Sequence, residues 1–287
     1  MKALILINAY APTTDTRQVI RLRDELNKLG VQVVVKRNDG FFASVADGRA
    51  QVSADYDFCV YLDKDKYVSH LLERKMRLFN SARAIELCDD KMTTHIALAD
   101  RGILMPDTIP GLLCYTPNAK IDEERLRVVE GRLGLPLVVK QSFGSLGKSV
   151  YLASSHDELL KIVNEIKLTP HLFQRFIGSS YGRDMRVIVV GGRALGGIIR
   201  QSDCDFRSNI GLGGHAHAVE VPTEIQQTAV RAAGALGLDY CGIDFLLGDT
   251  PMLCEVNSNA YFDAFESATE INVAEAYARH IIKKMGR

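Results

Sequence analysis

Two apolar segments near the C-terminus are joined by a short turn, and each contains one acidic residue. Asp244 interrupts the segment 240–247 and Glu255 interrupts the segment 252–257, with Gly-Asp-Thr-Pro between them at 248–251. Two short apolar runs around such a turn predict an antiparallel β-hairpin. A two- or four-residue turn places Asp244 directly opposite Glu255. The hairpin can therefore fold only where the negative charges of these two residues are compensated.

Facing carboxylates lie about 5 Å apart and repel each other, which destabilises a sheet unless a cation lies between them. Asn257 lies two residues beyond Glu255 and therefore on the same face of the strand. Oxygen ligands from Asp, Glu and Asn suit Mg²⁺, which completes its coordination shell with water and phosphate. We therefore predict a magnesium site at Asp244, Glu255 and Asn257. The alternative is a solvated Glu255 and a turn role for Asn257.

The chain has 287 residues, which favours two or three subdomains over a single core. Lys and Arg together number 35, as do Asp and Glu, so no net charge attracts nucleic acid or an anionic membrane. No apolar run approaches the ~18 residues of a membrane-spanning helix, and the first run is too short for a signal peptide. Six Cys without a CxxC pair indicate reduced thiols. We expect a cytoplasmic α/β protein whose partners are neither nucleic acid nor membrane.

The first third of the chain reads as alternating strands and helices. An apolar run at 2–7 precedes a segment of helical periodicity at 16–29, which Gly30 closes, and strands follow at 31–35 and 58–62. This order predicts a small doubly wound α/β domain over residues 1–88. No GxGxxG motif follows the first strand, which argues against a Rossmann dinucleotide site.

A glycine-containing loop at 142–148 ends in Gly-Lys followed by Ser149, and so resembles a P-loop. The first glycine of a P-loop is replaced by Ser142, and the following residues predict a strand rather than a helix. A strand–loop–strand arrangement favours a flap whose backbone N–H groups cover phosphates. Lys140 ends the preceding apolar strand, where an anion would justify its burial. The alternative is a glycine-rich hairpin without a ligand.

Together these features resemble the ATP-grasp ligases, and within them the RimK-like branch. The resemblance spans about residues 84–285 and rests on a series of motifs at 88–91, 136–140, 144–147, 174–177, 182–187, 205–209, 213–214, 242–244 and 255–258. It implies an α/β fold in which the N-terminal doubly wound domain precedes two α+β ATP-grasp subdomains. We place the central subdomain with the flap at 89–178 and the C-terminal subdomain with the metal and substrate site at 179–287.

The resemblance also implies roles for individual residues. The predicted nucleotide contacts are Lys91, Lys140, Gly144, Ser145, Gly147, Gln174, Arg175, Phe176, Ile177, Asp184, Arg207 and Asn209, with Asp184 at the ribose. The magnesium ligands match Asp244, Glu255 and Asn257, and the predicted catalytic arginines on the phosphate or acceptor side are Arg186, Arg200 and Arg207. Two departures are Arg175, where the family usually has Glu, and the segment 258–263, which replaces a Pro-Gly segment near the substrate.

The implied function is an ATP-dependent carboxylate–amine ligase that acts through an acylphosphate, with ATP and Mg²⁺ and with Mn²⁺ as a substitute metal. The expected partners are an amino acid and a carboxylate-bearing acceptor (a small molecule, peptide or carrier protein), and we expect a homodimer or homotetramer. Relatives in this branch add L-glutamate, and a spare guanidinium such as that of Arg200 would hold its carboxylate. Asp203, Asp205 and Asp263 would instead suit a cationic amine. Two alternatives are a nucleotide-binding regulator without turnover and a dipeptide ligase of the D-alanine–D-alanine type.

Overall fold

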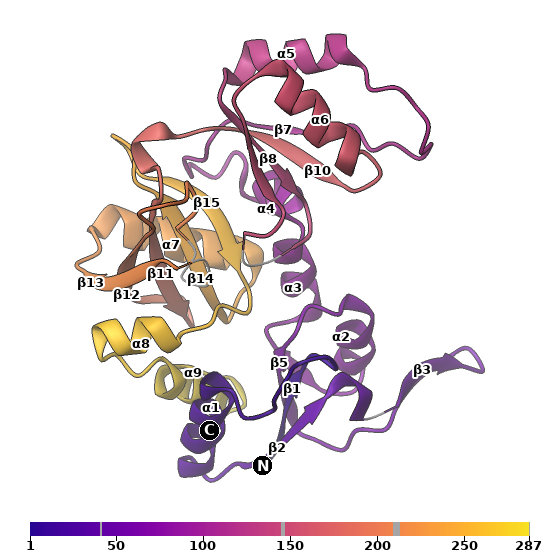
Figure 1. Ribbon diagram of the computed structural model, residues 1–287. Coiled ribbons are helices and arrows are strands. Elements are labelled where there is room, and N and C mark those ends of the chain that lie inside the picture. Colours follow the sequence, from indigo (N-terminus) through magenta and orange to yellow (C-terminus); the bar gives the residue numbers. More distant parts are fainter. Residues whose placement is uncertain (41, 145–146, 209–212, 287) are drawn as a thin grey trace.

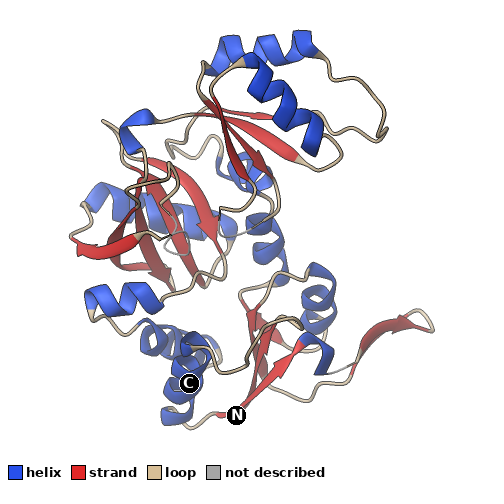
Figure 2. Cartoon of the chain, in the orientation of Figure 1, coloured by secondary structure: helices blue, strands red, loops and turns tan. Residues whose placement is uncertain are grey.

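The computed structural model describes residues 1–40, 42–144, 147–208 and 213–286. These residues form three sheets of four or five strands and one two-stranded hairpin (Figure 1). Helices cover the sheets, as the colouring by secondary structure makes plain (Figure 2). The structure thus confirms the predicted mixed α/β class.

The N-terminal sheet is parallel and has the order β2-β1-β5-β6. Its strands are β1 (Lys2–Ile7), β2 (Gln32–Arg37), β5 (Phe58–Leu62) and β6 (Arg77–Phe79). Residues 3–7 and 58–62 are buried throughout, as expected for a parallel sheet that is covered on both faces. The side chains of one face pack with α1 (Arg17–Lys28) and α9 (Val273–Lys284), and those of the other with α2 (Lys66–Glu73) and α3 (Ala82–Asp89). The doubly wound arrangement is therefore confirmed.

Helix α1 begins and ends where the sequence predicts. The Thr16 side chain accepts a hydrogen bond from the Val19 N–H, and Gly30 follows the helix with φ +77°, in the left-handed region. The sequence did not reveal the hairpin of β3 (Ala43–Ala46) and β4 (Arg49–Val52), which projects from this part of the chain (Figure 1).

The central sheet is antiparallel, with the order β7-β10-β8-β9. It contains β7 (Thr108–Pro110), β8 (Leu137–Gln141), β9 (Val150–Ala153) and β10 (His171–Arg175). Helices α5 (Glu123–Leu133) and α6 (His156–Ile166) share one hydrophobic core with these strands. Because the glycine loop joins antiparallel β8 and β9, it does not lead into a helix as a P-loop does.

The C-terminal sheet is antiparallel, with the order β13-β12-β11-β14-β15. It contains β11 (Arg183–Val190), β12 (Arg193–Gln201), β13 (His215–Val219), β14 (Tyr240–Leu246) and β15 (Met252–Asn257). Helix α7 (Thr223–Leu236) packs on one face, and α8 (Asp263–Thr269) packs against β12 and β13. Two short 3₁₀ turns complete the described elements, at Asn38–Gly40 and Gly178–Ser180.

The predicted pairing of β14 with β15 is correct at the two acidic residues. Asp244 pairs with Glu255, and Gly242 pairs with Asn257. Nearer the turn Phe245 pairs with Leu253, so Cys254 is the extra residue of a β-bulge. The bulge was not predicted, because turn length alone does not reveal an inserted residue.

Helix α4 (Lys91–Leu98) ends shortly before Asp100 and Gly102, which both adopt positive φ. It packs against α7 and β15, while α9 packs against α1. These helices pack across the predicted subdomain boundaries at residues 88 and 178. The boundaries therefore stay a prediction. No helix among the described residues combines the length and the apolar character needed to cross a membrane.

Asn80 joins the N-terminal sheet to the C-terminal one and is buried. Its Nδ2 donates to the Tyr240 and Ser258 carbonyl oxygens at 2.7 and 2.8 Å, and its Oδ1 accepts from the Asp239 and Tyr240 N–H groups at 2.7 and 3.0 Å. One side chain thus satisfies four backbone groups at the start of β14 and the end of β15.

We predict that Asn80→Ala lowers the free energy of unfolding by about 3 kcal/mol, because buried polar groups lose their partners. Urea unfolding of the parent and the variant measures this difference. Asn118→Ala is the control, because Asn118 is exposed, and it should leave the free energy of unfolding unchanged. Equal effects of the two substitutions would contradict the prediction.

Candidate active site

A cleft of about 520 Å³ lies where the three sheets meet. Every predicted site residue that the structure describes lines this cleft: Lys91, Lys140, Gly144, Gly147, Gln174, Arg175, Phe176, Ile177, Asp184, Arg186, Arg200, Arg207, Asp244, Glu255 and Asn257. Ser145 and Asn209, which were also predicted, lie outside the described residues. Residues predicted from separate motifs are therefore brought together in one place.

Four charged side chains of adjacent strands form a buried network at the base of the cleft. Arg186 donates to Asp244 through Nε and Nη2 at 2.7 and 2.8 Å. Arg200 donates to Asp184 at 2.8 and 2.5 Å and lies 3.0 Å from the Asp244 carboxylate. Burial by itself raises the pKa of Asp244, but the two guanidinium groups outweigh it and lower this pKa to about 2. Asp244 is therefore ionised and fixed in orientation.

This network changes two expectations. The repulsion predicted between the facing carboxylates is offset on the Asp244 side by two arginines, and on the other side Lys91 lies 3.7 Å from Glu255. Arg200 is only 4% exposed and bound to two carboxylates, so its guanidinium is not spare for an acidic substrate. The sequence did not reveal this, because the network depends on the pairing of β11 with β14, which brings together residues 58 positions apart in the chain.

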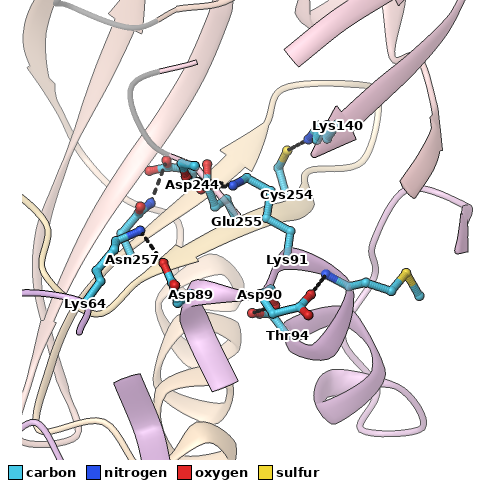
Figure 3. Close-up of polar contacts among 12 residues, drawn as sticks. Lys64, Asp89, Asp90, Lys91, Thr94, Lys140, Asp244, Cys254, Glu255 and Asn257 are labelled. Carbon is cyan, nitrogen blue, oxygen red and sulfur yellow. Dashed lines mark hydrogen bonds and ion pairs between the residues drawn. The ribbon is translucent and has the colours of Figure 1, made fainter. Parts of the chain in front are cut away.

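Lys91 reaches the cleft from the first turn of α4 (Figure 3). Asp90 caps this helix by accepting from the Met92 and Thr93 N–H groups, and the cap fixes where Lys91 leaves the helix. The Lys91 Nζ donates to the Gly144 carbonyl oxygen at 3.0 Å. Burial lowers the pKa of Lys91, and the nearby Glu255 opposes that change. Lys91 thus connects the glycine loop to the carboxylate hairpin.

Lys140 belongs to a buried hydrogen-bonded cluster. Its Nζ donates to Gln174 Oε1 at 2.7 Å and lies 3.3 Å from the sulfur of Cys254, the bulge residue. Gln174 in turn donates to Thr108 at 3.0 Å and lies 3.4 Å from His95 Nε2. Burial and the charge of Lys140 lower the pKa of His95 to about 4, which keeps its imidazole neutral at physiological pH. The cluster holds the Lys140 ammonium in one position.

The predictions missed Cys254 and Lys64, which line the cleft, and His95, which lies against Gln174. His95 lies four residues after Lys91 on α4, a spacing that would have placed both on one helical face. Lys64 follows β5, lines the cleft and pairs with Asp89 at 3.0 Å (Figure 3). The position of Lys64 just after a parallel strand could have revealed it. Ligands bind beyond the carboxyl ends of parallel strands, at the point where the strand order reverses.

Two arginines of the cleft have distinct partners. Arg175, the departure from the family pattern, donates to Asp107 at 2.9 Å and to the backbone carbonyls of Arg132 and Leu133. Its guanidinium therefore fastens β10 to Asp107 and to the C-terminal end of α5. Arg207 donates to the Gly147 carbonyl oxygen at 2.6 Å and pairs with Asp205 at 2.7 Å. It ties the described end of the glycine loop to the C-terminal part of the chain.

The proposed metal ligands suit a hard cation. Asp244 and Glu255 offer carboxylate oxygens, and Asn257 donates its amide to Asp244 at 3.3 Å, which leaves its own amide oxygen as a ligand. The Glu255 side chain is 33% exposed and so is accessible at the cleft. Asp244 Oδ1 accepts a single hydrogen bond from a described residue and retains a lone pair. This oxygen-only donor set fits Mg²⁺.

A family model for the RimK-like ATP-grasp domain matches residues 88–281. The chain belongs to the RimK-like ATP-grasp family. The match begins at α3 and extends into α9, so it includes all the proposed metal, lysine and arginine residues. Family membership confirms the resemblance found in the motifs.

Three similar proteins have descriptive names. Human beta-citrylglutamate synthase B is 37% identical over 209 residues, which are 71% of this chain and 53% of that protein. Human N-acetylaspartylglutamate synthase A is 36% identical over 208 residues, 71% and 52% of the two chains. A probable alpha-L-glutamate ligase of Maridesulfovibrio salexigens is 35% identical over 208 residues, 71% and 66%. The chain spans about half the length of the two human relatives.

Solved structures share the fold at low sequence identity. The ATP-grasp ligase PsnB, complexed with minimal precursor, Mg and ADP, aligns with a TM-score of 0.69 at 18% identity, over 99% of this chain and 98% of that one. The D-alanine–D-alanine ligase from Bacillus anthracis, complexed with ATP, aligns with a TM-score of 0.71 at 18% identity, over 99% and 97%. The predicted ATP-grasp fold is therefore confirmed.

We predict that substitution of the two facing carboxylates changes the free energy of unfolding by unequal amounts. Asp244→Asn breaks a buried ion-pair network and should lower the free energy of unfolding by about 3 kcal/mol. Glu255→Gln removes a partly exposed pair with Lys91 and should change it by less than about 1 kcal/mol. Urea unfolding at neutral pH, without metal or nucleotide, measures both values. An Asp244→Asn variant as stable as the parent would contradict the network as described.

The glycine loop provides a second prediction. Amide hydrogen exchange of residues 147–150 should slow at least several-fold when AMP-PNP and Mg²⁺ are added, because bound phosphates would accept from the N–H groups of a closing flap. Residues 156–166 of α6 serve as an internal control and should exchange at an unchanged rate. Exchange at 147–150 that does not respond to the nucleotide would exclude the flap role.

Proposed function

We propose that this protein is an ATP-dependent carboxylate–amine ligase that adds L-glutamate, or a similar amino acid, to a small carboxylate acceptor. The observation that carries the proposal is the single cleft in which Asp244 and Glu255 face each other beside Lys91 and Lys140. Facing carboxylates beside two cleft lysines suit a metal–triphosphate. Family membership supports the same reading.

The nucleotide base would occupy the apolar part of the cleft. Val138 and Phe176 line it from the central part of the chain, and Ile177 and Leu246 line it beside them. The phosphates would then extend toward Lys140 and the loop end at Gly147. Two predicted roles, adenine binding at 174–177 and ribose binding at Asp184, are part of this proposal. Asp184 is bound to Arg200, so it would act as an already oriented acceptor for a hydroxyl.

The reaction proceeds in two transfers. A carboxylate oxygen of the acceptor attacks the γ-phosphorus of ATP, the bond to the β-phosphate oxygen breaks, and ADP leaves an acylphosphate behind. The ammonium first loses a proton to water, and the resulting amine attacks the acyl carbon. The carbon–oxygen bond to phosphate breaks, and the departing phosphate takes the second proton from the nitrogen. Positioning and charge neutralisation supply most of the catalysis in phosphoryl transfer. No protein nucleophile is needed.

The chain's own residues divide this work. Lys91, Lys140 and Arg207 would hold the phosphates, and their positions are fixed by the hydrogen bonds described above. Asp244, Glu255 and Asn257 would hold Mg²⁺, which when bound neutralises phosphate charge and aligns the phosphates. Arg186 lies against Asp244 with its side chain 15% exposed and would contact the charge that develops at the acyl group.

The choice of substrates rests on the relatives. The names of the two human proteins combine glutamate with a citryl or an N-acetylaspartyl group, both small polycarboxylates. Lys64 contributes a cation to the cleft from the N-terminal sheet and would attract such an acceptor. We therefore propose citrate or N-acetyl-L-aspartate as the first acceptors to try, with peptides and carrier proteins as the further class.

Two alternative functions predict different patterns of ADP release. A nucleotide-binding regulator would bind ATP without amine-dependent turnover. A dipeptide ligase of the D-alanine–D-alanine type would release ADP with D-alanine alone, and the fold it shares with this chain does not exclude it. The motif 205–209 favours the RimK-like branch.

We predict that ADP release requires Mg²⁺, L-glutamate and either citrate or N-acetyl-L-aspartate together. Glu255→Gln should reduce the turnover by at least about 100-fold, as expected for loss of a charge-stabilising group. Glu275→Gln changes a partly exposed glutamate of α9 that does not line the cleft, and it should leave turnover at the parental level. EDTA should abolish turnover, and Mn²⁺ should restore it.

Three results would contradict the proposal in different ways. ADP release that ignores the amine indicates an ATPase, and ADP release with D-alanine alone indicates the dipeptide ligase. ATP binding without release under any combination indicates the regulator. In the last case the nucleotide affinity, measured by calorimetry, would still report on the ATP site.

A further inference from the structure

Five acidic side chains line the cleft, and one of them differs from the rest. Asp184, Asp244 and Glu255 each lie in an ion pair, and Asp63 accepts hydrogen bonds from Asn8 and from the Lys64 N–H. Asp263 accepts no hydrogen bond and forms no ion pair with any described residue, and its Oδ1 is enclosed by protein. A carboxylate of this kind lacks the compensation that burial requires.

A second unpartnered acceptor lies four residues earlier, in the loop that leads into α8, whose first residue is Asp263. Asn259 also lines the cleft, and its Oδ1 is enclosed and receives no hydrogen bond from the described chain. Buried polar atoms are nearly always hydrogen-bonded, so two unsatisfied acceptors four residues apart point to a missing donor. Because both residues are only partly buried and line the cleft, a rotation of either side chain would present its unsatisfied oxygen to a donor on a molecule bound there.

The loop that leads from Asn259 to Asp263 is fixed at Ala260, next to the proposed reaction centre. The Ala260 carbonyl oxygen accepts from the Tyr240 hydroxyl at 2.6 Å and from Gln18 Nε2 at 3.2 Å. A β-carbon built on Gly242 would lie 2.6 Å from the Ala260 Cβ and 3.5 Å from Arg186 Nε. The loop therefore abuts the Arg186–Asp244 pair, where the acyl group would react, and not the apolar end of the cleft.

The chemistry of this corner selects the ligand. Phosphate and carboxylate groups would be repelled by Asp263, whereas a primary ammonium brings three N–H donors and a positive charge. Arg17, whose charge acts on Asp263, donates to Ser267 at 3.3 Å and is not in an ion pair with Asp263. Burial raises the pKa of the Asp263 carboxyl, and the charge of Arg17 only partly offsets this. A ligand cation would complete the pairing that the protein does not.

We propose that Asp263, together with Asn259, binds the ammonium group of the amine substrate next to Arg186. This inference rests on the proposed ligase function and assigns the amine end of its substrate. It also replaces the earlier expectation that a free arginine selects the amino acid. The segment 258–263, where the sequence departs from its family pattern, is then the part of the site that holds the nucleophile.

The test compares L-glutamate with glutarate, which has the same two carboxylates and no amine. Calorimetry in the presence of AMP-PNP and Mg²⁺ should show that the parent binds L-glutamate at least tenfold more tightly than glutarate. Asp263→Asn should reduce this preference to less than twofold. Asp203→Asn is the matched control, since Asp203 is exposed and does not line the cleft, and it should keep the preference.

Turnover provides an independent readout. Asp263→Asn should raise the KM for L-glutamate at least tenfold and change the KM for ATP less than twofold. Hydroxylamine is an uncharged nucleophile near neutral pH, and ADP release that it supports should stay at the parental level. The melting temperature should not fall, because the substitution removes an uncompensated charge.

Each contrary result overturns the inference. A parent that binds glutarate as well as L-glutamate, or binds neither, excludes an ammonium site. An Asp263→Asn variant that keeps its preference, raises only the KM for the carboxylate acceptor, or melts well below the parent assigns the residue to another role. Failure of the proposed function looks different: the parent releases no ADP, whether or not Asp263 contributes to L-glutamate binding.

Discussion

The site depends on four charges buried together: Asp184, Arg200, Asp244 and Arg186. They come from β11, β12 and β14, and the strand register places Asp184 opposite Arg200 and Arg186 opposite Asp244. Any one of them alone would be strongly disfavoured at this depth, whereas together they satisfy one another. The strand register therefore also determines how the Asp244 carboxylate is oriented. A slip by one residue would turn all four away from each other.

The cations of the cleft come from separate parts of the chain. Lys64 follows β5 of the N-terminal sheet, and Lys91 is the first residue of α4. Lys140 lies near the end of β8 in the central sheet, and Arg207 reaches the glycine loop from the C-terminal part of the chain. Each is held by a local contact, so the positive charge is distributed over elements rather than gathered on one. A triphosphate would then be the common partner of elements that otherwise contact each other little.

Local patterns explain what the sequence could predict. The Asp244–Glu255 pairing follows from turn length, the ends of α1 from Thr16 and Gly30, and the rejection of a P-loop from the strand after Ser149. What it could not predict involves distant partners or few residues. The Asp244 arginines are set by strand pairing across more than fifty residues, the Cys254 bulge by a single insertion, and α8 and β7 are too short for periodicity to register.

The packing of α9 beside α1 has a consequence for how the chain becomes folded during synthesis. Val19, Leu22 and Leu26 of α1 share one hydrophobic core with Val273, Tyr277 and Ile281 of α9 (Figure 1). The N-terminal sheet and α1 therefore lack part of their hydrophobic core until α9 has been synthesised. Throughout elongation that apolar surface stays uncovered, which is the period when chaperones bind and nascent chains aggregate.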